Sequence, residues 1–259
     1  MPLLSLVDVR KSFGGLNAVS GLSFSVDEGT ITGLIGPNGA GKTTLFHIVT
    51  SVFPPSAGRV LLLGEDIAGR RPHDVTRKGI ARTFQNIRLF TTMTARENVM
   101  VGRHPRSHAG IWGSVLRTKS QRAEEARIRE KTDELLALMG LAGYEESPAG
   151  KLPYGHQRRL EIARALAAEP RLLLLDEPAA GMNESETREI HRLILAIRAM
   201  GVTVLLIEHD MELVMNVCDR LVVLNFGQKI AEGTPEEIRR NPQVIEAYLG
   251  KEEEDGRDA

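Results

Sequence analysis

The sequence lacks the features of several classes of protein. It contains one cysteine, Cys218, so an internal disulfide bond cannot form, and we expect this thiol to fill space beside apolar neighbours. Basic and acidic residues are nearly balanced, 33 against 34, whereas a dedicated nucleic-acid binder usually has a basic excess. We therefore expect no nucleic-acid partner.

Two further absences concern membranes and export. No apolar run approaches the roughly 18 residues that a membrane-spanning helix needs. Residues 1–9 lack the basic start and the long apolar core of a signal peptide. We expect a protein of the cytoplasm that reaches a membrane only by docking to proteins that span it.

What the sequence does contain is organised around residues 36–44, which read GPNGAGKTT and match the phosphate-loop pattern G-x-x-x-x-G-K-[ST]. A predicted buried strand, residues 31–35, precedes this loop, and a predicted helix, residues 45–49, follows it. In that context the loop N–H groups and the helix N-terminus bind phosphate, Lys42 supplies a cation and Thr43 a hydroxyl for Mg²⁺. The alternative is a glycine-rich turn that caps a helix and binds nothing. The predicted nucleotide-binding loop comprises Gly36, Pro37, Asn38, Gly39, Ala40, Gly41, Lys42, Thr43 and Thr44.

Acidic side chains follow a second predicted strand. Residues 171–175 form a run whose last four members are leucine, and Asp176 and Glu177 come directly after it. The carboxyl end of a buried parallel strand is where α/β proteins place their ligand-binding groups. Asp176 is suited to hold Mg²⁺, and Glu177 to orient and deprotonate a water aimed at the γ-phosphate. A solvent-facing acidic turn is the competing interpretation.

Three further residues are candidates on weaker grounds. Gln85 ends a predicted short strand, residues 79–85, where its amide could reach the metal or the attacking water. His209 follows another predicted strand, residues 202–207, and could contact the γ-phosphate. The ring of Phe13 could stack on an adenine base. The ordinary alternatives are a satisfied loop amide, a structural histidine and a core or edge-strand aromatic ring.

The remaining segments predict the architecture. Alternating residues at 3–13 and 22–26 indicate antiparallel strands ahead of the phosphate loop. A glycine-containing loop, residues 152–157, precedes an amphipathic helix, residues 158–168, and forms a second potential anion site. We expect an α/β fold with one core over residues 1–93 and 151–250, an inserted helical subdomain over residues 94–150, and a disordered acidic tail over residues 251–259.

Together these motifs resemble an ABC transporter ATPase subunit over nearly the whole chain. The resemblance implies the P-loop NTPase (RecA-like) fold, with a mostly parallel core sheet, an antiparallel β subdomain and the helical insertion. The phosphate loop corresponds to the family's Walker A motif and residues 172–176 to its Walker B motif. Phe13 stands where the family places its adenine-stacking aromatic residue. The implied catalytic residues are Glu177, His209 as the switch histidine, Gln85 of the Q-loop and Lys42, and the implied metal ligands are Thr43, Gln85 and Asp176.

The chain is similar in particular to the branched-chain (hydrophobic) amino-acid uptake type. The stretches that carry this similarity are ARTFQNIRLF at 81–90, RRLEIAR at 158–164, EPAAGMN at 177–183 and GTPEEI at 233–238. A C-terminal helix through residues 242–249 also fits this type. The similarity implies ATP hydrolysis that powers amino-acid import at the cytoplasmic face of the cell membrane, to which the subunit binds peripherally.

Two motifs depart from the general family pattern. The signature LSGGQ reads LPYGH here, so Pro153 offers neither a hydroxyl nor an N–H group to the γ-phosphate of a partner subunit, and we expect weakened rather than abolished binding. Asn183 replaces the D-loop aspartate, which has a role across the interface between cassettes. The signature residues that would act on the partner's ATP are Pro153, Tyr154, Gly155, His156 and Gln157.

The resemblance implies ATP and Mg²⁺ as ligands and two cassettes that face each other head to tail, as a heterodimer or a homodimer. It also implies two transmembrane permease subunits and, indirectly, an external substrate-binding protein. Alternative functions are transport of another substrate, a soluble ABC ATPase of translation or DNA repair, and a regulatory subunit that hardly hydrolyses ATP. The single cassette and the missing basic excess argue against the soluble ATPase, and the presence of Glu177 and His209 argues against the regulatory subunit.

Replacing Lys42 with alanine removes the fixed counter-charge of several phosphate oxygens. We therefore expect tight ATP binding, and the ATP hydrolysis that depends on it, to be lost. An ATPase assay and a titration with a fluorescent ATP analogue measure this loss. Turnover and affinity equal to those of the unaltered protein would contradict the assignment of residues 36–44 as a phosphate loop.

Overall fold

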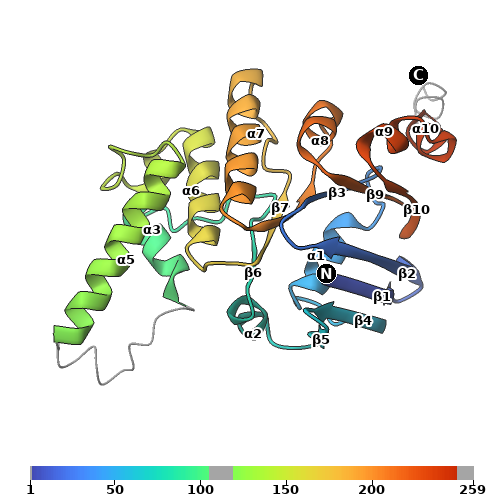
Figure 1. The fold of residues 1–259 in the computed structure, drawn as a ribbon, viewed down its shortest axis with the longest axis horizontal. Coiled ribbons are helices and arrows are strands. Elements are labelled where there is room, and N and C mark those ends of the chain that lie inside the picture. The colour runs from blue at the N-terminus through green and yellow to red at the C-terminus, as the bar shows by residue number, and fades with distance from the viewer. Residues whose placement is uncertain (1, 105–118, 250–259) are drawn as a thin grey trace.

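A computed structural model describes residues 2–104 and 119–249, and it places two sheets and a group of helices side by side (Figure 1). Within these residues the strands form a six-stranded sheet and a four-stranded antiparallel sheet. The predicted α/β fold, with a mostly parallel core sheet, a separate antiparallel sheet and a helical part, is confirmed. The acidic tail predicted at residues 251–259 lies outside the described residues.

The six-stranded sheet contains the strands that were predicted from apolar runs. Its order is β10-β9-β3-β8-β7-β6, and neighbours are parallel except for β10 and β9, which pair as an antiparallel hairpin. All residues of β3, β7 and β8 are buried, as is typical of parallel strands covered on both faces. Because Ile207 of β8 is opposite both Leu34 and Asp176, the carboxyl ends of these three strands meet at one edge. The strands are β3 (Ile31–Ile35), β6 (Ile80–Arg82), β7 (Leu172–Asp176), β8 (Thr203–Ile207), β9 (Arg220–Asn225) and β10 (Gln228–Gly233).

The antiparallel sheet packs against the first sheet through helix α1 (Lys42–Val49). Phe46 of this helix lies in a buried cluster that also contains Leu4 of β1 and Leu205 of β8, so the two sheets share one core. The N–H group of Ser20 donates to the carbonyl of Gly227 at 2.8 Å and ties the long hairpin to the β9–β10 turn. This sheet has the order β2-β1-β4-β5, with β1 (Pro2–Phe13), β2 (Leu16–Asp27), β4 (Ala57–Leu62) and β5 (Glu65–Asp66).

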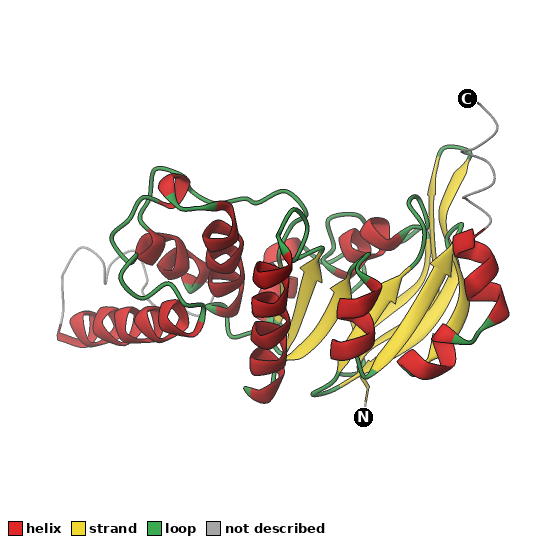
Figure 2. Cartoon of the chain, turned by 90° about the horizontal axis from the view of Figure 1, so that it is seen from above, coloured by secondary structure: helices red, strands yellow, loops and turns green. Residues whose placement is uncertain are grey.

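The helical part lies at the end of the molecule away from α9 and α10, as Figures 1 and 2 both show. Helix α3 begins after Thr94, and this residue forms a capping box in which its hydroxyl accepts from the N–H of Glu97 at 3.1 Å. Helix α6, which follows the predicted boundary at residue 150, packs against both α3 and α5. These helices are α3 (Ala95–Gly102), α5 (Lys119–Leu138), the 3₁₀ helix Ala149–Lys151 and α6 (Tyr154–Leu166).

The other helices belong to the two-sheet part of the molecule. None of the helices in residues 2–104 and 119–249 combines the length and the apolar composition that crossing a membrane requires. The helices not yet given are α2 (Pro72–Arg77), α7 (Glu184–Ala199), α8 (Met211–Val217), α9 (Pro235–Arg239) and α10 (Pro242–Leu249).

Two local predictions are wrong. The strand predicted over residues 79–85 ends at Arg82, and Gln85 lies beyond it because the carbonyls of residues 84 and 85 bond to a side chain of α6 instead of a strand. The helix predicted to start at residue 158 begins at Tyr154, so residues 154–157 are its first turn and not a loop. Pro153, with φ of −54°, precedes this turn as its N-cap, and its carbonyl accepts from the N–H of Gln157.

Because Cys218 is buried, we can predict the reactivity of its thiol. Desolvation raises the pKa of this thiol to about 12, and the carboxylates of Asp219 and Glu208 act in the same direction. Since the thiolate is the reactive form, we expect negligible reaction with a disulfide reagent at pH 8 in the native protein and full reaction in denaturant. Rapid labelling of the native protein would contradict the buried position.

Candidate nucleotide-binding site

The predicted phosphate loop connects β3 to the N-terminus of α1, as its motif requires. Gly36 and Gly41 have φ of 146° and 98°, and a Cβ atom at these positions would lie 2.0 Å from the Leu224 carbonyl oxygen and 2.4 Å from that of Ala18. Glycine is therefore needed at both places for the loop to close against β9 and β2. Lys42 is buried, and its Nζ donates to the carbonyls of Gly36 at 2.6 Å and Pro37 at 3.0 Å.

A hollow of about 530 Å³ lies beside this loop. Side chains from β2, the phosphate loop, the segment after β6, and the ends of β7 and β8 meet around it, so residues far apart in the sequence share one site. Phe226 of the β9–β10 turn also borders the hollow, with its side chain 83% exposed. The lining residues are Leu16, Asn17, Ala18, Asn38, Gly39, Ala40, Gly41, Lys42, Thr43, Thr44, Gln85, Glu177, His209 and Phe226.

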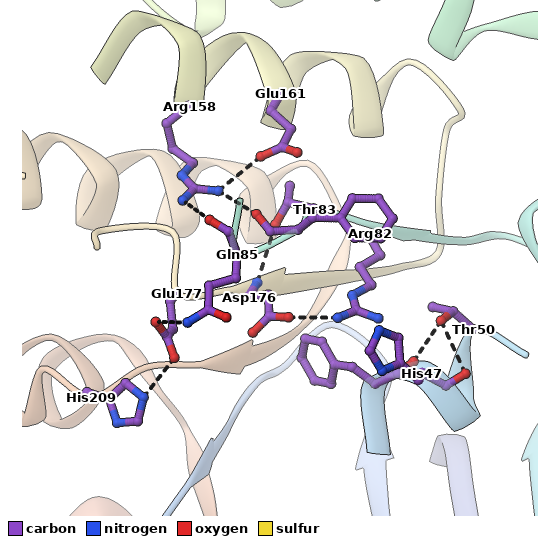
Figure 3. A network of polar contacts seen from close by, with 12 residues as sticks. His47, Thr50, Arg82, Thr83, Gln85, Arg158, Glu161, Asp176, Glu177 and His209 are labelled. Atoms are coloured by element: carbon purple, nitrogen blue, oxygen red, sulfur yellow. Dashed lines mark hydrogen bonds and ion pairs between the residues drawn. The ribbon is translucent and has the colours of Figure 1, made fainter. Parts of the chain in front are cut away.

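The carboxylate of Glu177 contacts two other predicted residues, Gln85 and His209 (Figure 3). Its Oε2 accepts a hydrogen bond from Nε2 of Gln85 at 3.0 Å, and its Oε1 lies 2.7 Å from Nε2 of His209. The Glu177 backbone has φ of 48°, a rare value for a residue other than glycine, and its N–H donates to the carbonyl of Ile207 at 2.9 Å. The bend after β7 thus turns this carboxylate toward both neighbouring segments.

Asp176 takes part in a buried ion pair that sequence reasoning missed. Its Oδ2 lies 2.7 Å from Nη2 of Arg82, with both side chains almost completely buried, and its Oδ1 has no hydrogen-bond partner among the described residues. The Arg82 guanidinium also lies over the rings of Phe46 and Phe84. Asp176 itself does not line the hollow. The sequence signal for this pair was a basic residue, Arg82, within the predicted strand 79–85. That strand, β6, lies next to β7, which carries Asp176.

Phe13 does not line the hollow. Its half-exposed ring lies edge-on to Phe53, with centroids 5.6 Å apart, and Nζ of Lys11 is 5.1 Å from its centroid. The ring is therefore held at the tip of the β1–β2 hairpin near the hollow's Leu16 side, with one part open to solvent.

The signature residues are also separate from this hollow, and the structure places them at the start of α6. Gly155 is buried, and a Cβ atom there would lie 2.9 Å from Oε1 of Glu186. The His156 ring stands edge-on to Tyr144, and burial, followed by the charge of Arg159, lowers the pKa of its imidazole. The phosphate loop of this chain therefore lines the hollow, and its signature residues do not.

Sequence reasoning also missed three other buried charged residues, Arg158, Glu161 and Glu208. Glu208 accepts from the N–H of Ala179 at 2.9 Å, and burial raises the pKa of its carboxyl above the ordinary value. The signal for Glu161 was a charged residue within the apolar stripe of the helix, directly between Leu160 and Ile162. All three form hydrogen bonds to the main chain of segments that contain candidate site residues.

A phosphate loop between a buried strand and a helix, with carboxylates at neighbouring strand ends, defines a phosphate-loop nucleotide-binding cassette. A family described as ABC transporter matches residues 19–180, and one described as branched-chain amino acid ATP-binding cassette transporter matches residues 228–254. The chain belongs to the ABC transporter family, and the resemblance drawn from its motifs is confirmed.

Individual relatives agree along the whole chain. The high-affinity branched-chain amino acid transport ATP-binding protein BraF of Pseudomonas aeruginosa is 47% identical, over 96% of this chain and 98% of BraF. The corresponding protein LivG of Escherichia coli is 44% identical over the same shares. A solved ATP-binding cassette of an ABC transporter in its ADP conformation has a TM-score of 0.84 and 34% identity, covering 96% of this chain and 99% of that one.

The buried pair of Arg82 and Asp176 gives a prediction about stability. Arg82→Met leaves a buried carboxylate without its partner, which we expect to lower the free energy of unfolding by about 3–5 kcal/mol. The matched control is Arg70→Met, which breaks an exposed pair with Glu65 and should cost less than about 1 kcal/mol. Urea denaturation measures both, and equal losses in the two variants would contradict the assigned burial.

Proposed function

We propose that the chain binds ATP in the hollow beside the phosphate loop and hydrolyses it to power import of branched-chain amino acids. The observation that carries this proposal is the convergence of Gln85, Glu177 and His209 across the hollow from Lys42. The substrate class is supported by the names of the relatives, which are branched-chain amino acid transport proteins. The import direction is supported by the similarity of the motifs to the uptake type.

The geometry around Glu177 supports its role as the general base. Both carboxylate oxygens have fixed directions, because Gln85 holds Oε2 and His209 holds Oε1. A water in the hollow could give its proton to this carboxylate. The His209 Nε2–H would contact the γ-phosphate only by exchanging Oε1 of Glu177 for a phosphate oxygen. Lys42 would exchange the carbonyls of Gly36 and Pro37 for phosphate oxygens, which are stronger partners for an ammonium group. The reaction then depends on positioning and on neutralising charge.

Mg²⁺ fits the oxygen atoms that this site offers. Thr43 and Gln85 line the hollow. Asp176 does not line it but directly precedes Glu177, which does, and its buried Oδ1 atom has no hydrogen-bond partner in the described part of the chain. Hydroxyl, amide and carboxylate oxygens are the ligands that this cation prefers. Once bound, the ion would neutralise charge on the β- and γ-phosphates. Phe13, with its exposed face, would stack on the adenine base.

A second cassette would complete the ATP site. The signature residues 153–157 do not border the hollow of their own chain, so they would close the hollow of a partner. Helix α6 presents its N-terminal N–H groups there, but its N-cap Pro153 has no side-chain hydrogen bond to add. The two sites of a heterodimer would then differ in strength, with the weaker site built on the partner's phosphate loop. A homodimer would have two equal sites.

Two transmembrane permease subunits would dock beside the segment that contains Gln85, in a groove that shares no lining residue with the nucleotide hollow. A largely apolar groove of about 750 Å³ is lined there by Phe84, Leu89 and Phe90 of this segment, by Val101 of α3 and by Arg164 of α6. An amphipathic cytoplasmic helix would fit such a groove. Docking there would place the chain on the cytoplasmic face of the membrane as a peripheral subunit, with an external substrate-binding protein acting indirectly through the permeases.

The experiment that tests this function uses the complete transporter in lipid vesicles. We expect leucine, isoleucine or valine, delivered by the binding protein, to stimulate ATP hydrolysis and to be taken up. Glu177→Gln should slow hydrolysis by about 10²–10⁴-fold while ATP still binds, because only the base is lost. Glu184→Gln, an exposed change at the start of α7, is the matched control.

Normal turnover in the Glu177→Gln complex would contradict the role of this residue. Stimulation by a different class of solute, with the branched-chain amino acids inactive, would contradict the proposed substrate and leave the ATPase assignment intact.

A further inference from the structure

Helix α6 carries a buried ion pair that no part of the hydrolysis chemistry uses. Arg158 and Glu161 are one helical turn apart, 0% and 1% exposed, and Nη1 of Arg158 lies 3.0 Å from Oε2 of Glu161. Desolvating two charges is unfavourable unless their remaining donors and acceptors are also bonded. Among the described residues Arg158 Nε has no partner, and the partners that the other atoms of the pair do have indicate what the pair does.

Those partners are main-chain groups of the segment that contains Gln85 (Figure 3). Arg158 donates from Nη1 to the carbonyl of Phe84 at 2.6 Å and from Nη2 to the carbonyl of Gln85 at 2.7 Å. Glu161 accepts from the N–H of Arg88 at 3.2 Å through its other oxygen, Oε1. Residues 84–88 belong to neither a helix nor a strand, so the pair provides bonds that secondary structure would otherwise supply.

The same segment reaches the candidate base. While the Gln85 carbonyl bonds to Arg158, the Gln85 side chain donates to Oε2 of Glu177 at 3.0 Å. At the other end of the connection, Arg158 follows the signature residues in the same helix, and its Nη2 lies 3.4 Å from the Tyr154 hydroxyl. One continuous set of short contacts therefore joins the first turn of α6 to the Glu177 carboxylate.

We propose that Arg158 and Glu161 are positioning residues, which hold the main chain of residues 84–88 on α6 so that a displacement of α6 moves the Gln85 amide beside Glu177. This inference rests on the proposed ATPase function and deepens it. Neither residue lines the hollow and both are buried, so neither would contact nucleotide bound there. The pair sets how well Gln85 and Glu177 are aligned, and it links that alignment to the helix that begins with the signature.

The test compares variants of the full chain assembled in the transporter complex. We expect Arg158→Met to lower kcat by about tenfold or more, with KM for ATP and the Kd of a fluorescent ATP analogue changed less than about twofold. Amide hydrogen exchange at Arg88, whose N–H donates to Glu161, should become about tenfold faster or more, because residues 84–88 lose the two carbonyl bonds that hold them on α6 and open more often.

Two further variants distinguish a positioning role of the pair from a role in folding. One keeps the positive charge at residue 158, and the other removes both charges. Arg158→Lys keeps the charge but cannot reach two carbonyls with a planar fork, so we expect only partial recovery of kcat. The double variant Arg158→Met with Glu161→Leu leaves no unpaired buried charge and should recover thermal stability relative to Arg158→Met. Its kcat should stay low, since the carbonyls of residues 84 and 85 still lack their donor.

The control is Arg96→Met, which removes the ion pairs with Glu146 and Asp133 in the same helical part without touching residues 84–88. We expect its kcat and its exchange at this segment to remain unchanged. A double variant with kcat and exchange equal to those of the unaltered chain would overturn the proposal, because the pair would then only fill space. If the unaltered complex hydrolyses no ATP, the proposed function fails, and unchanged exchange in Arg158→Met would separately overturn the positioning role.

Discussion

The alignment of three buried parallel strands, β3, β8 and β7, is the constraint on which the rest of the structure depends. All of their residues are buried and most are apolar, and the ladder places Ile207 of β8 opposite both Leu34 and Asp176. Because the strands run in the same direction, each delivers its following residues to one edge of the sheet. The phosphate loop, Glu177 and His209 are neighbours for this reason alone, although up to 173 positions separate Gly36 from His209 in the chain.

Buried charge is concentrated around this edge and is paired in two different ways. Arg82 pairs with Asp176 and leaves one carboxylate oxygen without a partner in the described residues, as suits a group that can also take a cation. Arg158 and Glu161 are instead bonded to each other and to the main chain of residues 84–88. The first arrangement suits the binding of a ligand. The second suits the transfer of a displacement from α6 to residues 84–88. Both are costly unless the surrounding contacts are kept, so they tie the site to the fold.

Of the residues predicted for the site, the structure gathers the phosphate loop, Gln85, Glu177 and His209 around one hollow, whereas Phe13 and Asp176 do not line it. The phosphate loop and Asp176-Glu177 were recognisable because a buried apolar run precedes each of them, and strand ends in a parallel sheet share an edge. The strand to Gln85 was predicted too long because its last carbonyls bond to Arg158, a residue 73 positions away. The start of α6 was placed too late because Pro153 was taken for part of a loop, whereas it caps the helix.

The sequence by itself determined the fold class, the phosphate loop and the residue types of the chemistry, because these follow from local patterns of apolarity, glycine and charge. Only the tertiary structure decided that Gln85 and His209 share the Glu177 carboxylate, that Arg82 is buried against Asp176, and that the signature helix holds the Gln85 segment. Each of these contacts joins residues that lie at least 32 positions apart. Their meeting depends on how the strands and helices pack, which no local pattern records.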